Sequence, residues 1–266
     1  MNRETLRALL PSLVADHLPR NVGNIHYRVY DGHAHISPIG LHIDPQPFQG
    51  TVIAKTDEAL IIKTGRISFA AVDRHLATED PEPGTKVQVV PYARRDFSGE
   101  RIDKPIEETQ HMEDGRSYTV STVVLGRRMI KLPLPEARCP ELADLIHQVE
   151  ELPAPDGFRT IANMLADANA RDFSSVDPAP AGIIDTPPAI IFHVSTVKYA
   201  GQAAIVYDRG LDLYVVELRR DGDVHRRVDQ IDFTSLAATL EDLIDDGSWR
   251  RIQVVELGRK AKRTLH

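Results

Sequence analysis

Cysteine and long apolar runs are what this sequence has least of. Its only cysteine, Cys139, excludes an intramolecular disulfide, and no CxxC pair offers a zinc or thiol-exchange site, so a reducing compartment is predicted. The best apolar run, Ala189 to Val197, is far shorter than the roughly 20 residues that cross a bilayer. Charged residues also interrupt the leucines near the N-terminus, where a signal peptide needs an apolar core. We therefore expect a soluble, cytoplasmic protein without membrane contacts.

Common catalytic signatures are absent as well. The sequence has no GxSxG elbow, no GxxxxGK[ST] phosphate loop, no GxGxxG turn and no HExxH helix. This absence favours a non-enzymatic protein without a cofactor, although residues that are distant in the sequence can still meet in an active site. Aromatic residues make up only 6% of the chain, which leaves few partners for stacking on nucleic-acid bases.

What the chain does contain is typical of a folded protein. Apolar residues make up 42% and charged residues 27%, far from the composition of disordered chains. Its 266 residues exceed the commonest size of a single domain, so two domains are expected. The net charge of −7 argues against a chain that is basic throughout, as many nucleic-acid binders are.

The first part, residues 1–171, predicts helices around a small β-barrel or meander. Leucines at helical spacing predict a helix over Arg3–Leu18, which Pro11 interrupts. Four short β-type runs separated by turns then favour a small barrel. These runs are Gln49–Lys55, Ala59–Thr64, Ile67–Asp73 and Lys86–Pro91.

The rest of this part predicts an exposed connection, a hairpin and two helices. The connection is polar and covers residues 92–115. The hairpin is expected from Ser117–Leu125 and Arg128–Leu132, with its turn at Gly126 and Arg127. One helix is expected to start at Pro140, where proline is favoured, and a second covers Phe158–Ala170.

A proline-rich stretch over residues 172–188 predicts a linker to a second domain at 189–266. Four apolar runs separated by glycine turns predict antiparallel strands, and Asp232 is a suitable N-cap for the helix that follows. Arg251–Leu257 is expected to be the last strand, before a basic tail. The fold class expected for the whole chain is therefore α+β, with a C-terminal antiparallel ββββαβ domain.

Two histidines suggest a metal site. His33 and His35 are two residues apart, so on a strand they point the same way and can share a divalent ion. The five residues from Asp31 to His35 resemble the metal-binding start of the amidohydrolase family, which implies a metal-dependent hydrolase. That family needs eight alternating β/α units, whereas consecutive short strands follow here. The alternative is that both are surface histidines that serve as hydrogen-bond donors.

His193 is a further candidate because it lies in an apolar strand. An imidazole buried there is costly unless it is hydrogen-bonded, and the favoured interpretation is a satisfied core histidine. Ser195 lies on the same face and is the only close partner for catalysis. Neighbours on one strand do not make a triad.

Basic clusters suggest contacts with DNA or RNA. Five arginine pairs occur along the chain, and adjacent arginines on a strand are expected to split between its two faces. Equal numbers of basic and acidic residues from Thr186 to His266 favour a salt-bridged surface instead. The residues proposed for nucleic-acid contact are Arg94 and Arg95, near Tyr92 and Phe97, and Arg259, Lys260, Lys262 and Arg263 of the tail.

Five short segments lie between residues 49 and 95: Gly50–Ile53, Thr56–Asp57, Ile61–Arg66, Val72–Arg74 and Pro83–Val87. With these segments, residues 49–95 resemble the short KfrB domain of plasmid and mobile-element accessory proteins. It implies an accessory protein for the maintenance or transfer of a mobile element, acting through a protein partner or through DNA. Three hypotheses follow: a non-enzymatic interaction protein, a metal-dependent hydrolase that uses His33 and His35, and a nucleic-acid-binding protein.

Overall fold

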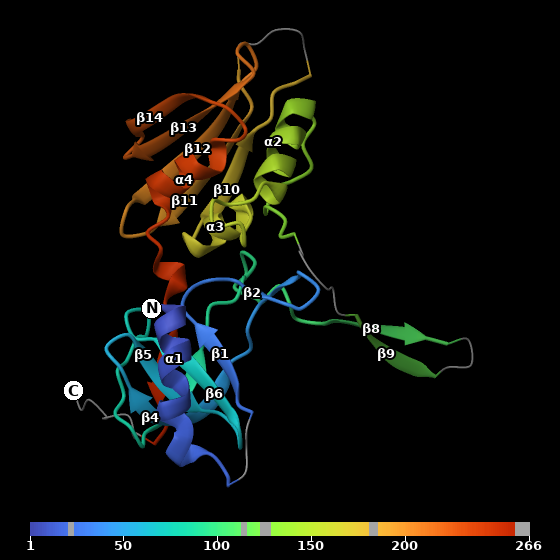
Figure 1. Ribbon diagram of the computed structural model, residues 1–266. Coiled ribbons are helices and arrows are strands. Elements are labelled where there is room, and N and C mark those ends of the chain that lie inside the picture. Colours follow the sequence, from blue (N-terminus) through green and yellow to red (C-terminus); the bar gives the residue numbers. More distant parts are fainter. Residues whose placement is uncertain (21–23, 113–115, 123–128, 181–185, 259–266) are drawn as a thin grey trace, which may run out of the picture. The chain divides into compact units, whose positions relative to one another are not determined.

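The computed structural model describes residues 1–20, 24–112, 116–122, 129–180 and 186–258. It is an α+β structure that divides into two compact units, each assembled from separate stretches of chain (Figure 1). Unit 1 contains Met1–His35, Ile43–Ala93 and Trp249–His266, and unit 2 contains Ile36–His42 and Arg94–Ser248. None of the described helices is long and apolar enough to cross a membrane.

Unit 1 is a six-stranded sheet in the order β1-β6-β5-β4-β7-β15. Strand β1 runs parallel to β6, and the other neighbours are antiparallel. The strands are β1 (His26–Tyr30), β4 (Phe48–Lys55), β5 (Ala59–Lys63), β6 (Ser68–Asp73), β7 (Lys86–Val90) and β15 (Gln253–Glu256). Helix α1 (Arg3–Val14) packs Leu6, Leu10 and Val14 against Ile61 and Phe69 on one face. Other residues of the same strands, Leu60 and Ile62 among them, join a second apolar cluster.

Three expectations for this region are corrected. The strands form an open sheet rather than a closed barrel, since β1 and β15 extend it on either side. Helix α1 continues through Pro11, because leucines before and after the proline are anchored on the sheet. The last predicted strand belongs here and not to the C-terminal domain, because β15 pairs with β7.

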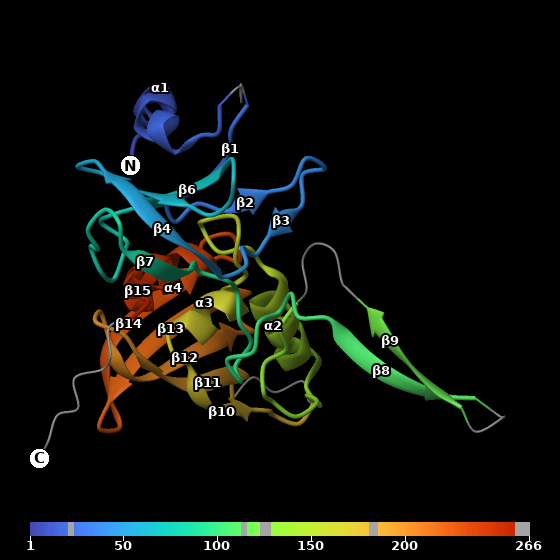
Figure 2. The same cartoon turned by 90° about the horizontal axis from the view of Figure 1, so that it is seen from below.

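Unit 2 is built on a five-stranded antiparallel sheet in the order β10-β11-β12-β13-β14. The strands are β10 (Arg171–Val176), β11 (Ala189–Ser195), β12 (Ala200–Asp208), β13 (Leu213–Arg220) and β14 (Asp223–Ile231). Three helices, α2 (Pro140–Glu151), α3 (Ile161–Asp167) and α4 (Leu236–Ile244), lie on one side of this sheet in Figure 1, and Figure 2 shows the same arrangement from below.

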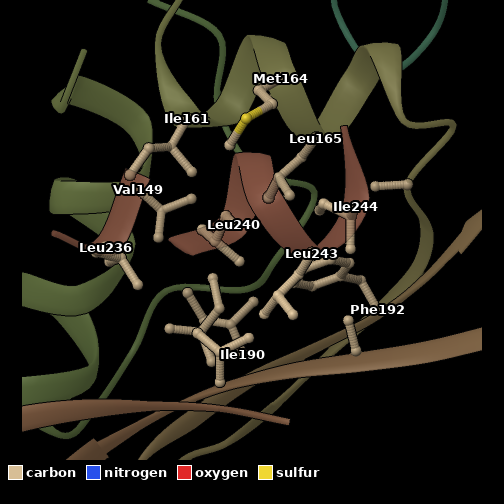
Figure 3. Packing of buried hydrophobic residues seen from close by; sticks show 14 of the residues in the cluster. Val149, Ile161, Met164, Leu165, Ile190, Phe192, Leu236, Leu240, Leu243 and Ile244 are labelled. Atoms are coloured by element: carbon tan, nitrogen blue, oxygen red, sulfur yellow. The ribbon is translucent and has the colours of Figure 1, made fainter. Parts of the chain in front are cut away.

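The core of unit 2 lies between these helices and the sheet (Figure 3). Ile190 and Phe192 of β11 contribute to it from the sheet, and Leu165 and Leu240 contribute from α3 and α4. Because side chains alternate along a strand, the neighbours of Ile190 and Phe192 point to the opposite face of the sheet.

The predicted division of the chain differs from the observed one. Strand β10 lies inside the predicted linker and is an edge strand of the sheet, with residues 181–185 outside the described part. Helices α2 and α3 share the core of the C-terminal strands and not that of the first part. The apolar faces of α2 and α3 must be buried against another element, and the sheet formed by the strands that follow these helices provides that surface. Cys139, which directly precedes α2, is buried.

The predicted hairpin is also different. Strand β9 (Ser117–Thr122) pairs with the preceding β8 (Ile106–His111) and not with the following segment. The predicted turn at Gly126 and Arg127 lies outside the described residues. The remaining elements are short: β2 (His35–Ile36), β3 (His42–Ile43) and single 3-10 turns at Ala15–His17 and Ser248–Arg250.

Candidate functional site

The face of the unit 2 sheet opposite its helices carries charged side chains in register; we call it the open face. Two rows of residues cross the strands there, because paired residues of neighbouring strands point the same way. The first row is Arg171, His193, Gln202 and Arg219, from β10 to β13. The second row is Ile191, Ala204, Glu217 and Arg227, from β11 to β14.

Glu217 lies near the middle of the open face between two arginines. Only 5% of this residue is exposed. Its Oε2 accepts hydrogen bonds from Nε and Nη2 of Arg219 at 2.8 and 2.5 Å, and its Oε1 accepts one from Nη1 of Arg227 at 2.5 Å. Arg227 also donates to Asp229 at 2.7 Å. We refer to Glu217, Arg219 and Arg227 as the Glu217 cluster.

The two guanidinium groups retain donors that the cluster does not use. Nη1 of Arg219 and Nη2 of Arg227 donate no hydrogen bond to any residue that the structure describes. The side chains of Arg219 and Arg227 are 29% and 50% exposed, so both arginines are in part reached by solvent. Planar guanidinium groups bind carboxylate and phosphate oxygens through paired N–H donors. The cluster is therefore suited to hold an anion beside Glu217.

A β-bulge brings a carboxylate to His193. The pairing of β10 with β11 shifts register between Arg171 and Ser174, which inserts one extra residue into β10. Asp172 in the bulge has φ = +55°, a left-handed conformation that aspartate tolerates better than most residues. Its Oδ2 lies 3.7 Å from Nδ1 of His193, and this nitrogen has no hydrogen-bond partner in the described part of the chain.

His193 is therefore not the satisfied core histidine that the sequence suggested. Its side chain is 42% exposed on the open face, because it alternates with the core residues Phe192 and Val194. Ser195 forms no hydrogen bond with His193 among the described residues, so the two do not form the start of a triad.

Strand β12 separates His193 from the Glu217 cluster. Neighbouring strands lie about 4.8 Å apart, so the backbones of β11 and β13 are about 10 Å apart. Gln202 and Ala204 of β12 form the floor between them. Ala204 is fully buried and Gln202 is half-buried, so neighbouring side chains cover the sheet between His193 and Glu217.

A second arginine cluster in unit 2 is enclosed. Arg159 is 0% exposed and forms ion pairs with Asp156 at 2.8 Å, Asp167 at 2.9 Å and Asp245 at 2.5 Å. Burial disfavours its charged form, yet the surrounding carboxylates raise the pKa of Arg159 above its ordinary value. We call these four residues the Arg159 cluster. It has no access to a ligand and is a structural feature.

The predicted metal ligands are in unit 1. His33 is exposed, and its Nδ1 lies 3.2 Å from Oδ1 of Asp31. His35 is half-buried, with its ring 5.0 Å from that of Tyr30. Although burial raises the pKa of Asp31, two hydrogen bonds from Arg3 lower it to about 2. Within the described ranges, no three His, Cys, Asp or Glu side chains are grouped so that they could hold a metal ion.

The residues predicted to contact nucleic acid are not gathered in one described site. Arg94 is only 2% exposed, and its guanidinium carbon lies 4.4 Å from the centre of the Phe158 ring. It is therefore not accessible to a phosphate, because cation–π packing and burial hold it inside. Arg95 is exposed at the surface and donates to the carbonyl of Gly99 at 2.7 Å. Arg259, Lys260, Lys262 and Arg263 lie outside the described residues.

The arginine pairs of β13 and β14 split between faces as the alternation predicts. Arg219 and Arg227 point to the open face, whereas Arg220 lies 5.9 Å from the core residue Tyr199 and Arg226 lies 3.4 Å from Asp242 of α4. Glu217 was not among the residues predicted from the sequence to form a site. Its signal was a carboxylate in an otherwise apolar strand, next to one of the arginine pairs.

Comparison with protein-family models, with curated proteins and with solved structures finds no match to this chain.

Proposed function

We propose that this protein binds the phosphodiester backbone of a nucleic acid on the open face of unit 2. The observation that carries the proposal is a pair of arginines held side by side by one buried glutamate, on a face that the helices leave uncovered. Holding both guanidinium groups in place before binding lowers the entropy that is lost when they bind a phosphate. Their unused N–H donors supply the contacts.

The first row of the open face extends this site across the sheet. Arg171 and His193 continue the line of Arg219 toward β10. Three strand spacings make the row about 14 Å long, which exceeds the size of a single phosphate group. An elongated polyanion therefore fits the row better than a small anion does.

The expected mode of binding is contact with the backbone rather than with the bases. The two rows contain no phenylalanine, tyrosine or tryptophan on which a base could stack. Arginine contacts with phosphates position a strand without reading its sequence. The affinity should therefore depend little on sequence and fall steeply with salt.

The arginine pairs provide matched controls for this proposal. We expect the double variant Arg219→Ala, Arg227→Ala to bind a fluorescent single-stranded RNA at least about tenfold more weakly in low salt. Each arginine–phosphate contact releases counterions from the RNA, and the loss of a contact therefore removes that favourable contribution to binding. The variant Arg220→Ala, Arg226→Ala removes the same charge from the same strands but on the helix side, and it should bind like the unchanged protein. Fluorescence anisotropy measures both affinities, and circular dichroism checks that both variants are folded.

Three results would count against the proposal. Equal weakening in both double variants would show that total charge matters and not the open face. Absence of binding by the unchanged protein even in low salt would end the proposal. If a polyglutamate peptide binds as tightly as RNA, the face recognises acidic proteins and the interaction-protein hypothesis becomes the better one.

A further inference from the structure

We infer that strand β1, at the edge of the unit 1 sheet, binds an extended acidic segment of a partner protein as an additional strand. The inference is independent of nucleic-acid binding, because β1 belongs to unit 1 and the open face belongs to unit 2. In recognition of this kind, backbone hydrogen bonds supply affinity and alternate side chains supply specificity.

The backbone groups on the outer side of β1 have no hydrogen-bond partner in the described part of the chain. Strand β1 pairs with β6 alone, in a continuous register from His26 to Tyr30. The N–H of His26 donates to the carbonyl of Ile67 at 2.9 Å and therefore points toward β6. Because these directions alternate along a strand, the N–H and C=O groups of Tyr27 and Val29 point outward. They are available to a further strand.

The opposite edge of the same sheet is closed by a neighbouring segment. The Thr78 hydroxyl accepts from the N–H of Val254 at 2.9 Å and donates to its carbonyl at 3.2 Å. The N–H of Thr78 donates to the carbonyl of Ile252 at 3.0 Å, and the N–H of Glu256 donates to the Glu79 carboxylate at 3.3 Å. An uncovered edge strand is a template for pairing with another chain. In this sheet β1 is therefore the edge that can accept a strand.

The edge strands of the unit 2 sheet have a disturbed register. The pairing of β10 with β11 shifts at the Asp172 bulge, and the pairing of β13 with β14 shifts at two points. Bulges twist an edge strand and oppose the addition of another strand. The pairing of β1 with β6 shows no such shift over its five residues, so β1 offers a regular template.

A groove of about 600 Å³ lies along β1 and has a basic lining. His26 and Arg28 line it together with Phe48 and the hydroxyl residues Thr64 and Ser68. No carboxylate is among the described residues of this lining. Arg28 is exposed and forms no ion pair within the ranges that the structure describes. Electrostatic complementarity therefore favours an acidic side chain on the strand that binds.

The side chains of β1 define the sequence pattern of the partner. Arg28 and Tyr30 lie on one face of the sheet, whereas Tyr27 and Val29 lie on the other. Val29 packs against the apolar cluster of α1, and Tyr27 is 37% exposed. Side chains of an added strand point to the same face as the residues that they pair with. The partner strand therefore alternates acidic residues beside Arg28 with apolar residues beside Tyr27 and Val29.

A second copy of β1 fits this edge less well than an acidic strand does. Arg28 is the central residue of β1, so antiparallel pairing of two copies about their centres places two Arg28 side chains opposite each other. Like charges directly opposite each other on neighbouring strands are destabilising. The charge of β1 thus selects a different, acidic sequence.

The first test measures binding of a labelled peptide that alternates glutamate and valine and is long enough to span β1. Fluorescence anisotropy with the full chain should show saturable binding. A peptide that alternates lysine and valine should bind at least about tenfold more weakly, because its charges repel Arg28. If the glutamate peptide does not bind, or if both peptides bind equally, the inference is overturned.

Methylation of the peptide backbone tests the strand pairing without changing the protein. One version of the glutamate peptide has every glutamate N–H methylated, and another has every valine N–H methylated. Only one of these two sets can face β1, so one version should bind like the unmodified peptide and the other should lose binding. Equal binding by both versions would refute the addition of a strand.

A charge reversal in the protein locates the site. Arg28→Glu should exchange the preference, so that the lysine peptide binds more tightly than the glutamate peptide. Arg7→Glu makes the same change on an exposed position of α1 and should bind like the unchanged protein. Equal weakening by both variants would assign the effect to total charge and overturn the inference. A dimer of the unchanged protein that Arg28→Glu disrupts in sedimentation would also overturn it, since β1 would then pair with a second copy.

Discussion

The two arginine clusters of unit 2 use the same chemistry in opposite ways. In the Arg159 cluster one arginine is surrounded by three aspartates and is fully buried. In the Glu217 cluster one glutamate is buried beneath two arginines that remain partly exposed. The enclosed cluster can only hold the protein together, whereas the open cluster has donors left for a ligand. Whether an ion-pair network only stabilises the fold or can also bind a ligand therefore depends on whether it lies inside the packed core or at the surface.

The Arg159 cluster joins parts of unit 2 that are distant in the sequence. Asp156 lies before α3, Asp167 is the last residue of α3, and Asp245 follows α4. Arg159 reaches all three carboxylates, and Asp156 also accepts hydrogen bonds from the backbone N–H groups of Phe158 and Arg159 at 2.8 Å. Removing the cation leaves the aspartates buried together.

The largest effect is therefore expected from Arg159→Ala. Loss of one member of a buried ion-pair network costs about 3–5 kcal/mol, because the remaining charges have no partner. Urea unfolding of the variant should show a free energy of unfolding lower by this amount. Arg220→Ala is the control, since Arg220 is exposed and should have little effect. A loss below about 1 kcal/mol for Arg159→Ala would show that the cluster is not a source of stability.

Acid should weaken the same cluster. Burial raises the pKa of Asp156, but its hydrogen bonds and Arg159 outweigh this and lower the pKa below its ordinary value. A carboxylate with a lowered pKa in the folded state stabilises the fold above the unfolded-state pKa. This contribution is lost as the pH falls below about 4. Urea unfolding at a series of pH values should show a steeper loss for the unchanged protein than for Asp156→Asn. An equal loss of stability with falling pH in the two proteins would show that Asp156 is not the group responsible.

A smaller effect is expected at the bulge beside the open cluster. Asp172→Ala should lower the free energy of unfolding by about 1 kcal/mol, because alanine adopts φ = +55° less readily than aspartate. Asp172→Gly should cause no comparable loss, since glycine accepts this conformation. Thermal unfolding compares the two variants. If glycine destabilises as much as alanine, the carboxylate contacts and not the backbone conformation account for the effect.

The smallest change in stability is expected from the double variant Arg219→Ala, Arg227→Ala. Removing both arginines uncovers Glu217, so its carboxylate gains water in exchange for the lost ion pairs. We expect a decrease of less than about 1 kcal/mol in urea unfolding, together with the loss of RNA binding. A decrease as large as that of Arg159→Ala would show that both clusters stabilise the fold to the same extent and would contradict the comparison made above.

Local features of the fold were readable from the sequence. The turn-separated runs of unit 1 and the strands of unit 2 were expected from alternation and glycine turns. The helix that starts at Pro140 was expected from its first-turn proline and apolar spacing. Strand β10 and the pairing of β8 with β9 were missed, because polar edge strands lack an apolar pattern.

Only part of the candidate site could be predicted from the sequence. His193 was noticed as a histidine in an apolar strand, but alternation with Phe192 and Val194 places it outside the core. The arginine pairs were noticed too, whereas Glu217 was not. The distances from Glu217 to Arg227 and from His193 to Asp172 depend on pairing between strands, which is set by tertiary packing.

By itself the sequence determined the types of element, most of their positions and the split of adjacent arginines between two faces, because these follow from local conformational preferences and side-chain alternation. Only the tertiary structure decided that the last strand, β15, pairs with β7, that α2 and α3 cover the C-terminal strands, and that Glu217 lies between two arginines. The physical reason is that pairing and burial depend on which surfaces remain available once the other elements have packed.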